Sequence, residues 1–383
     1  MYYLKEGQQS IIDLARKVAE EGVAPHAAEV DSDSRFPREA IAALGEAGLM
    51  GLTIPTEFGG LGQSPAVMVA VLDEVAQRCG STAMIYMMHL CGVSGYLADP
   101  DRFATELKAA AAGKHLSTLA FSEKGSRSHF WAPVSKVEAC DGGFSLSAEK
   151  SWVTSAGYVD GIVSSSGSSD GTGASVWLVR RDDPGVEASG GWDSLGMRGN
   201  DSKPMSYVGV KLTEDRLIGE EGKGSDIMLG TILPTFLMCQ GAIGVGFAEA
   251  AYQASHRHIN AHGFQHTGKK LSDLPNQRAR LARLRIAADT ARAYLAGVVA
   301  KAEAGAEDAM LHLLALKANS TEVAVDSADL AMRACGGAAF SKHLGLERVF
   351  RDSRAAIVMA PTTDHLHEFI GRLLCGMELF ESA

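Results

Sequence analysis

Three residues of this sequence, among its many titratable side chains, are candidates for acid–base or anion-binding chemistry. Arg127 and His129 stand two positions apart in the run Arg127-Ser128-His129, and Asp364 stands near the C-terminus. An imidazole exchanges protons near neutral pH, and a guanidinium can hold a carboxylate, sulfinate or phosphate group. Asp364 offers a carboxylate that could act as a base. These three residues are therefore the candidate catalytic groups.

Each candidate also has an interpretation that involves no catalysis. Arg127 and His129 suit an exposed, solvated loop. The run Thr362-Thr363-Asp364 is typical of a helix start, where Asp364 would stabilise the positive end of the helix dipole. The residue types alone leave both interpretations open.

Composition and charge narrow the class of protein. The chain has 383 residues and a formal net charge of −10, and its basic residues are scattered, which argues against nucleic acid as a partner. No signal peptide and no uninterrupted apolar run of membrane-spanning length is apparent, so we expect a protein with no membrane contact. Six widely spaced cysteines without a Cys-x-x-Cys pattern are expected to be buried thiols, not metal ligands. We therefore expect a cytoplasmic protein without a metal site.

The elements that would position the candidate groups fall into three blocks. Residues 1–118 carry apolar side chains at helical spacing. Residues 119–214 contain short β-branched runs separated by Asp-Gly turns, which favour hairpins. Residues 215–383 return to long amphipathic segments such as 281–301 and 310–335. The sequence predicts an α+β multidomain protein with an N-terminal helical domain, a central antiparallel β domain and a C-terminal helical bundle.

Several short motifs occur in one order along nearly the whole chain. They are IPTEFGGLG at 54–62, LAFSE at 119–123 followed by Ser128, EKSWVTS at 149–155, MRGNDS at 197–202, CGGAAF at 335–340 and ERVFRD at 347–352. Together they resemble the motifs of the acyl-CoA dehydrogenase family. The resemblance implies that family's fold, with a β-barrel-like central domain and a C-terminal four-helix bundle, and it implies FAD as the cofactor.

The resemblance also implies which residues contact FAD. The matching positions are Phe121, Ser122, Ser128, Trp152, Thr154, His262, Phe264, Arg333, Gly336, Gly337, Thr362 and Asp364. In the family, the segment at Phe121-Ser122 supplies donors to the flavin ring, and Gly336-Gly337 lets a neighbouring subunit's FAD diphosphate approach the backbone. Without the resemblance, Trp152 would equally suit a half-buried strand, and Gly336-Gly337 would equally suit a helix C-cap.

The match fails at the position of the family's catalytic base. Relatives place a glutamate eight residues after the Asp of the Arg-Asp pair, and this chain has Ala360 there, followed by Pro361. Some relatives place the glutamate on the first bundle helix, where this chain has Pro234. The next residue, Thr235, replaces an arginine that helps to hold CoA. A positioned base is worth roughly 10²–10⁴-fold in rate, so its loss decides the reaction.

Three functions therefore stay open. The first is α,β-dehydrogenation of an acyl thioester, on CoA or a carrier protein, by a relocated base. The second is other flavin chemistry on the same fold, such as monooxygenation or C–S cleavage. The third is a catalytically inactive flavin-binding partner. The resemblance further implies a homotetramer or homodimer, with an electron acceptor or oxygen as the second reactant.

Overall fold

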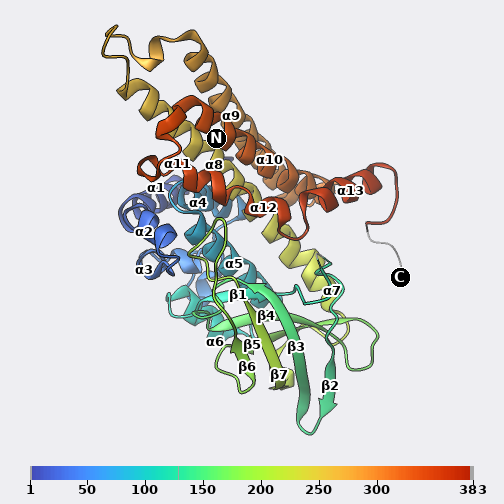
Figure 1. Cartoon of the computed structure of the whole chain (residues 1–383). Helices are drawn as coiled ribbons and strands as arrows, with labels where there is room; N and C mark the ends of the chain where they lie inside the picture. Colours follow the sequence, from blue (N-terminus) through green and yellow to red (C-terminus); the bar gives the residue numbers. More distant parts are fainter. Residues whose placement is uncertain (1, 128, 380–383) are drawn as a thin grey trace.

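The computed structural model describes residues 2–127 and 129–379, and it shows helical, β-sheet and helical parts in chain order (Figure 1). The helices of the N-terminal part are α1 (Gln9–Val18), α2 (Ala27–Ser32), α3 (Arg38–Glu46), α4 (Pro65–Ala76), α5 (Gly80–Tyr96) and α6 (Ala104–Ala111). Every residue of α5 is buried, because α4, strand β1 and helix α8 pack around it. A helix buried on all sides needs no polar face, so its sequence is apolar all round.

The central part consists of two four-stranded sheets that share one core. The strands are β1 (Ser117–Ala120), β2 (Val137–Cys140), β3 (Gly143–Val153), β4 (Gly161–Gly167), β5 (Ala174–Arg180), β6 (Val186–Ala188), β7 (Lys203–Leu212) and β8 (Leu217–Ile218). The orders are β1-β4-β5-β8 and β2-β3-β7-β6. The second sheet is antiparallel throughout, whereas β1 pairs with β4 in parallel. The central domain is therefore antiparallel in its strand pairs except for the parallel pair of β1 and β4.

The C-terminal part is a helical bundle. Its helices are α7 (Gly224–Ile227), α8 (Leu233–Ala261), α9 (Pro275–Glu303), α10 (Ala309–Cys335), α11 (Leu346–Asp352), α12 (Ala355–Val358) and α13 (Thr363–Leu374). Helices α8, α9 and α10 pack on one another, and α13 packs on α10. Gly244 lets the backbones of α8 and α10 approach each other closely, because a Cβ there would lie 2.6 Å from the backbone oxygen of Ser320 on α10. These four helices form the four-helix bundle that the sequence resemblance implied.

Two features of the chain differ from the sequence expectations. Residues 224–261 form a helical run that is long and apolar enough to cross a membrane by length and composition alone, although 67% of its most apolar window is buried inside the protein. This burial is what the core helix of a bundle requires. The six cysteines are free thiols, but Cys140 and Cys375 are exposed, because Cys140 ends β2 at a hairpin turn and Cys375 follows the end of α13.

Candidate active site

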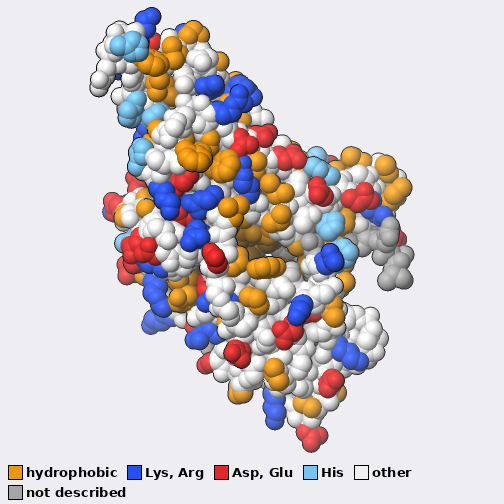
Figure 2. Space-filling model, in the orientation of Figure 1, with side chains coloured by type: hydrophobic (Ala, Val, Ile, Leu, Met, Phe, Trp, Pro, Cys, Tyr) orange, Lys and Arg blue, Asp and Glu red, His pale blue; other side chains and the backbone are white. Residues whose placement is uncertain are grey.

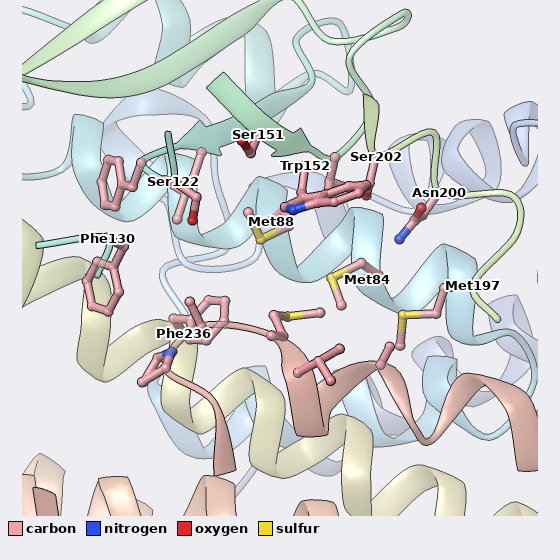
Figure 3. Close-up of a pocket in the computed structure, with 18 of the residues that line it drawn as sticks. Met84, Met88, Ser122, Phe130, Ser151, Trp152, Met197, Asn200, Ser202 and Phe236 are labelled. Atoms are coloured by element: carbon pink, nitrogen blue, oxygen red, sulfur yellow. The ribbon is translucent and has the colours of Figure 1, made fainter. Parts of the chain in front are cut away.

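A cleft of about 770 Å³ lies between the sheets and the helices. Its walls come from α5, the segment 121–127, the end of β3, the first turns of α8 and the residues after α12. Figure 2 shows apolar side chains gathered around this hollow, and Figure 3 shows the side chains that point into it. The volume is in the range of cofactor and substrate pockets, which are mostly apolar with a few polar groups.

Backbone hydrogen bonds fix the segment that begins at Phe121 against β3. The N–H of Ser151 donates to the carbonyl of Ser122 at 2.9 Å, and the N–H of Lys124 donates to the carbonyl of Glu149 at 2.9 Å. Phe121 and Ser122 both line the cleft. The segment therefore extends the sheet edge over the cleft, where the sequence resemblance placed a flavin contact.

A buried ion pair locks this same segment. The Nζ of Lys150 lies 2.5 Å from Oε1 of Glu123 and 2.6 Å from the carbonyl oxygen of Ser165. The other oxygen of Glu123 accepts the N–H groups of Val134 and Ser135, each at 2.7 Å. Burial opposes ionisation of Glu123, but the Lys150 ammonium and the donors of Ser135 outweigh it and lower the pKa of Glu123. Glu123 is therefore ionised and its oxygens are engaged in these contacts, so it is not available as a base.

Trp152 is held over the cleft by an irregularity in β3. The pairing of β3 with β7 shifts register between Lys150 and Val153, and Trp152 within this interval has a φ of 58°. Such a bulge re-aims a side chain, and a positive φ is rare for an aromatic residue. The ring is 66% exposed and meets Trp192 edge-on at 5.9 Å. Figure 3 shows the ring above Met84 and Met88.

Polar groups stand at one side of this ring. The hydroxyl groups of Thr154 and Ser202 lie 3.0 Å apart, and both residues line the cleft. The side-chain oxygen of Asn200, another lining residue, is buried without a hydrogen-bond partner. An orphaned acceptor beside an exposed aromatic ring and an apolar floor fits a planar ligand with polar edges. The residues present therefore fit a flavin ring.

The opposite wall contains Ala360. Helix α12 ends at Val358, and Met359, Ala360 and Pro361 all line the cleft. Among the described residues that line the cleft, Glu123 is the sole carboxylate, and none is a histidine, tyrosine or cysteine. The cleft thus offers a methyl group at Ala360 and no uncommitted base.

The candidate catalytic residues do not converge on this cleft. Asp364 is exposed in the first turn of α13, and Thr362 caps that helix by accepting the N–H of His365 at 3.3 Å. The helix-start interpretation of this run is therefore confirmed. His129 is exposed and stacks on Trp131 at 4.8 Å. Arg127 alone of the three lines the cleft, on its exposed side, and Ser128 lies outside the described residues.

The remaining residues assigned to FAD lie elsewhere in the chain. They are His262, Phe264, Arg333, Gly336 and Gly337, which are all exposed and do not line the cleft. His262 follows the end of α8 and stacks on His258 at 4.5 Å. Beyond the adjoining residues of the chain, no described atom lies within 4 Å of the place where a Cβ of Gly336 or Gly337 would be. A single chain therefore does not bring these residues to Trp152.

Two methionines of α5 line the cleft, although their place in an apolar helical segment of the sequence favours ordinary core. Met84 and Met88 are 1% and 9% exposed, and both line the cleft floor below Trp152 (Figure 3). Their spacing of four residues places them on one face of the helix. That spacing was the available signal, but a buried apolar helix offers many such pairs, so it did not distinguish the floor of a cleft from ordinary core.

Comparison with known proteins identifies the family. Residues 5–106, 118–210 and 222–374 match the N-terminal, middle and C-terminal domains of acyl-CoA dehydrogenases. The chain belongs to the acyl-CoA dehydrogenase family. This confirms the family, the fold and the expectation of a flavoenzyme that the sequence motifs implied.

The proteins and structures that this chain resembles differ in what their names state. The chain is 27% identical to the probable acyl-CoA dehydrogenase FadE25 of Mycobacterium tuberculosis, over 98% of this chain and 97% of that protein. Glutaryl-coenzyme A dehydrogenase, solved with glutaryl-CoA, has a TM-score of 0.92 at 22% identity, covering 99% and 98% of the two chains. PigA, solved with FAD and proline, has a TM-score of 0.89 at 20% identity, covering 98% and 99%. These two structural likenesses establish the fold alone.

Proposed function

We propose that this protein is an FAD-dependent oxidoreductase that acts on an apolar small molecule. In this reaction the protein chain supplies no carboxylate base. One observation carries the proposal: the described lining of the cleft holds a single carboxylate, Glu123, whose two oxygens are already engaged. When bound, FAD would supply two-electron redox chemistry, for which PigA, solved with FAD on the same fold, is a precedent.

The chain's own residues would hold the cofactor by shape and orientation. The exposed face of Trp152 and the hydroxyl of Thr154 would orient the ring, and the segment at Phe121-Ser122 would meet one of its edges. The apolar floor formed by Met84 and Met88 would exclude water from the reacting face. Removal of a proton from carbon would leave a negative charge, and an apolar floor does not stabilise charge. The floor therefore favours a reaction in which the protein removes no proton from carbon.

This arrangement favours the second of the functions that the sequence left open. Taking the α-proton from an acyl thioester needs a base within hydrogen-bond reach of that carbon. Ala360 has none, and Asp364 is exposed on α13, outside the cleft. Monooxygenation or C–S cleavage does not need that base. We therefore propose chemistry of this kind, with oxygen as the second reactant and NAD(P)H-derived reduced flavin as the source of the two electrons.

Dehydrogenation of an acyl thioester is the second candidate. It is supported by relatives such as FadE25 of Mycobacterium tuberculosis, which match this chain from end to end and are named as probable acyl-CoA dehydrogenases. A base would then have to come from outside the lining of the cleft, for example from the substrate itself.

One experiment separates the two candidates. The purified flavin-loaded protein is mixed anaerobically with a panel of short, medium, long and branched acyl-CoA thioesters while its visible spectrum is followed. The proposal expects no bleaching by any thioester, and rapid recovery of the spectrum when chemically reduced protein meets oxygen. Bleaching by an acyl-CoA would overturn it in favour of dehydrogenation. Colourless protein that takes up no FAD would overturn both candidates.

We also propose that the protein is cytoplasmic and works as a homotetramer or homodimer. His262, Gly336 and Gly337 support the assembly, because they match family positions near FAD yet lie exposed and away from the cleft in one chain. A second copy could bring them to the cofactor.

A further inference from the structure

A lysine of α10 lies completely buried behind the wall of the cleft that carries Ala360. The side chain of Lys317 is 0% exposed, and its Nζ donates to the carbonyl oxygens of Met359 at 2.9 Å and Pro361 at 2.5 Å. A third carbonyl, that of Ala356 in α12, lies 3.4 Å away. An ammonium group has three protons to donate, so these three carbonyls match its full capacity.

The three carbonyls belong to one short stretch of chain, residues 356–361. Helix α12 ends at Val358, so the carbonyls that follow have no partners further along the helix. In a buried place, carbonyls without donors are unfavourable. Lys317 supplies the missing donors from α10 and thereby joins the two elements.

The same stretch forms one wall of the proposed flavin site. Met359, Ala360 and Pro361 line the cleft, and so does Phe236, whose ring centre lies 6.0 Å from the Nζ of Lys317. Lys317 does not line the cleft. It therefore acts through the residues in front of it and cannot itself serve as a base toward a bound substrate.

The charge of Lys317 is unusual for its surroundings. Burial lowers its pKa to about 7, and within the described part of the chain it forms no ion pair. Titratable groups on the elements packed around it have other contacts or face solvent: Cys239 of α8 contacts Met68, Arg354 beside α12 pairs with Asp329, His367 of α13 pairs with Glu322, His365 of α13 stacks on Phe369, and Asp364 is exposed. The three carbonyls are therefore the groups that favour its charged form.

We propose that Lys317 is a positioning residue of the cleft, whose ammonium group fixes residues 356–361 and whose loss of a proton releases them. The inference rests on the proposed function only in that the wall so fixed would face FAD. Its consequence is that the shape of the wall at Ala360 changes with pH around neutrality, without any titrating group in the cleft itself.

Two substitutions test this in the full-length, flavin-loaded protein. Lys317→Met keeps the length and burial of the side chain but removes the donors, and Lys317→Arg keeps a cation that does not lose its proton. Lys301→Met is the matched control, because Lys301 on α9 is partly exposed and pairs with Asp308 away from the cleft.

The first measurement is amide hydrogen exchange of the peptide spanning 355–361, corrected for the intrinsic pH dependence of exchange. We expect exchange in the wild type to be about tenfold faster at pH 8.5 than at pH 6, fast at both pH values in Lys317→Met, and slow at both in Lys317→Arg. The control variant should follow the wild type. Wild-type protection without pH dependence, or Lys317→Met matching the wild type, would overturn the proposal.

The second measurement is the absorption spectrum of the oxidised flavin between pH 6 and 8.5, a range in which the oxidised ring does not titrate. The wild type should shift with a midpoint near 7, and Lys317→Met should show no shift. If the protein takes up no flavin, the proposed function fails, but the exchange measurement still decides the role of Lys317. If Lys317→Met does not fold, the wild-type pH profile and Lys317→Arg decide it.

Discussion

Asp352 is a buried carboxylate that anchors one edge of the cleft. It accepts the N–H of Met197, a cleft-lining residue, at 2.5 Å, and a Cβ on Gly80 at the start of α5 would lie 2.6 Å from its other oxygen. Burial is the largest influence and raises the pKa of Asp352 from 3.8 to about 6, against the opposing effect of the Met197 N–H. The ionised form is therefore unfavourable in the folded protein.

This predicts an unusual pH dependence of stability. Between pH 4 and 6 the folded state keeps a proton on Asp352 that the unfolded chain has released, so the contribution of Asp352 to stability falls as pH rises through this range. Asp352→Asn keeps an acceptor for Met197 but cannot ionise. We expect the variant to gain about 2–3 kcal/mol relative to the wild type between pH 4 and pH 7, measured by urea unfolding at both pH values. A difference between the two proteins that does not vary with pH would contradict this.

Ala360 provides the second prediction at this scale. If the Arg-Asp motif is aligned as the sequence implies, Ala360→Glu places a carboxylate on the cleft wall where relatives have their base. We expect acyl-CoA to bleach the flavin of this variant at least about 10²-fold faster than that of the wild type, followed anaerobically in a stopped-flow spectrometer. Ala355→Glu is the control, because Ala355 also lines the cleft but lies outside the motif position. A folded, flavin-loaded Ala360→Glu that stays yellow would refute the alignment.

Residues that lie in or near a sequence motif could be predicted to line the cleft. Phe121, Trp152, Thr154 and Ala360 were placed near the flavin from three separate motifs, and all four line one cleft. Their assignment to FAD stays a prediction. Lys317 could not be found in this way, because its role depends on three carbonyls more than thirty residues away in the chain, and no local pattern marks such a contact.

At the scale of elements, the contact between α8 and α10 depends on two glycines. A Cβ at Gly241 would lie 2.8 Å from the side chain of Leu316, and one at Gly244 would lie 2.6 Å from the backbone of Ser320. A side chain can turn aside, but a helix backbone cannot, so Gly244 is the more restrictive of the two. Helix α10 was predicted from the amphipathic segment 310–335, whereas its distance from α8 is set by these glycines.

Gly244→Ala should therefore destabilise the fold. We expect a loss of about 1–3 kcal/mol in the free energy of unfolding, because the added methyl forces the two helices apart. Gly297→Ala on α9 is the matched control: apart from its own helix, nothing described lies within 4 Å of its Cβ position, so it should gain about 0.5–1 kcal/mol from helix propensity. Chemical denaturation compares the two. Equal effects of both substitutions would show that the glycines of α8 do not set the helix spacing.

The element that the sequence described least well is β1. Its parallel pairing with β4 joins residues more than forty positions apart, Ser117 with Gly161 through Ala120 with Ser164. The hairpin turn of Asp141 and Gly142, in contrast, lies between β2 and β3 as the sequence predicted. Local turn chemistry can be read from neighbouring residues, but a pairing across the domain depends on how the whole sheet closes.

At the scale of the molecule, a large aromatic side chain stands unpacked beside α10. Phe340 is 87% exposed and follows the glycines Gly336 and Gly337, so a single chain leaves an apolar group in water there. The proposed homotetramer or homodimer would cover it.

Phe340→Asp tests this directly. We expect the mass measured by light scattering to fall toward that of the 40.4 kDa chain, because a carboxylate in an apolar contact is strongly unfavourable. Ile286→Asp on α9 serves as the comparison, since Ile286 is also exposed, at 64%. An assembly of unchanged mass in Phe340→Asp would place the contact between copies elsewhere.

The cleft takes its walls from α5, from the sheets and from the bundle, and no two of these parts enclose it. The C-terminal part of the lining runs from Arg351 to Pro361, so the cleft is complete only when this stretch has packed against α5 and the sheets. If FAD binds there as we propose, the yellow colour of a purified fraction would report the share of the protein in which all three parts have come together.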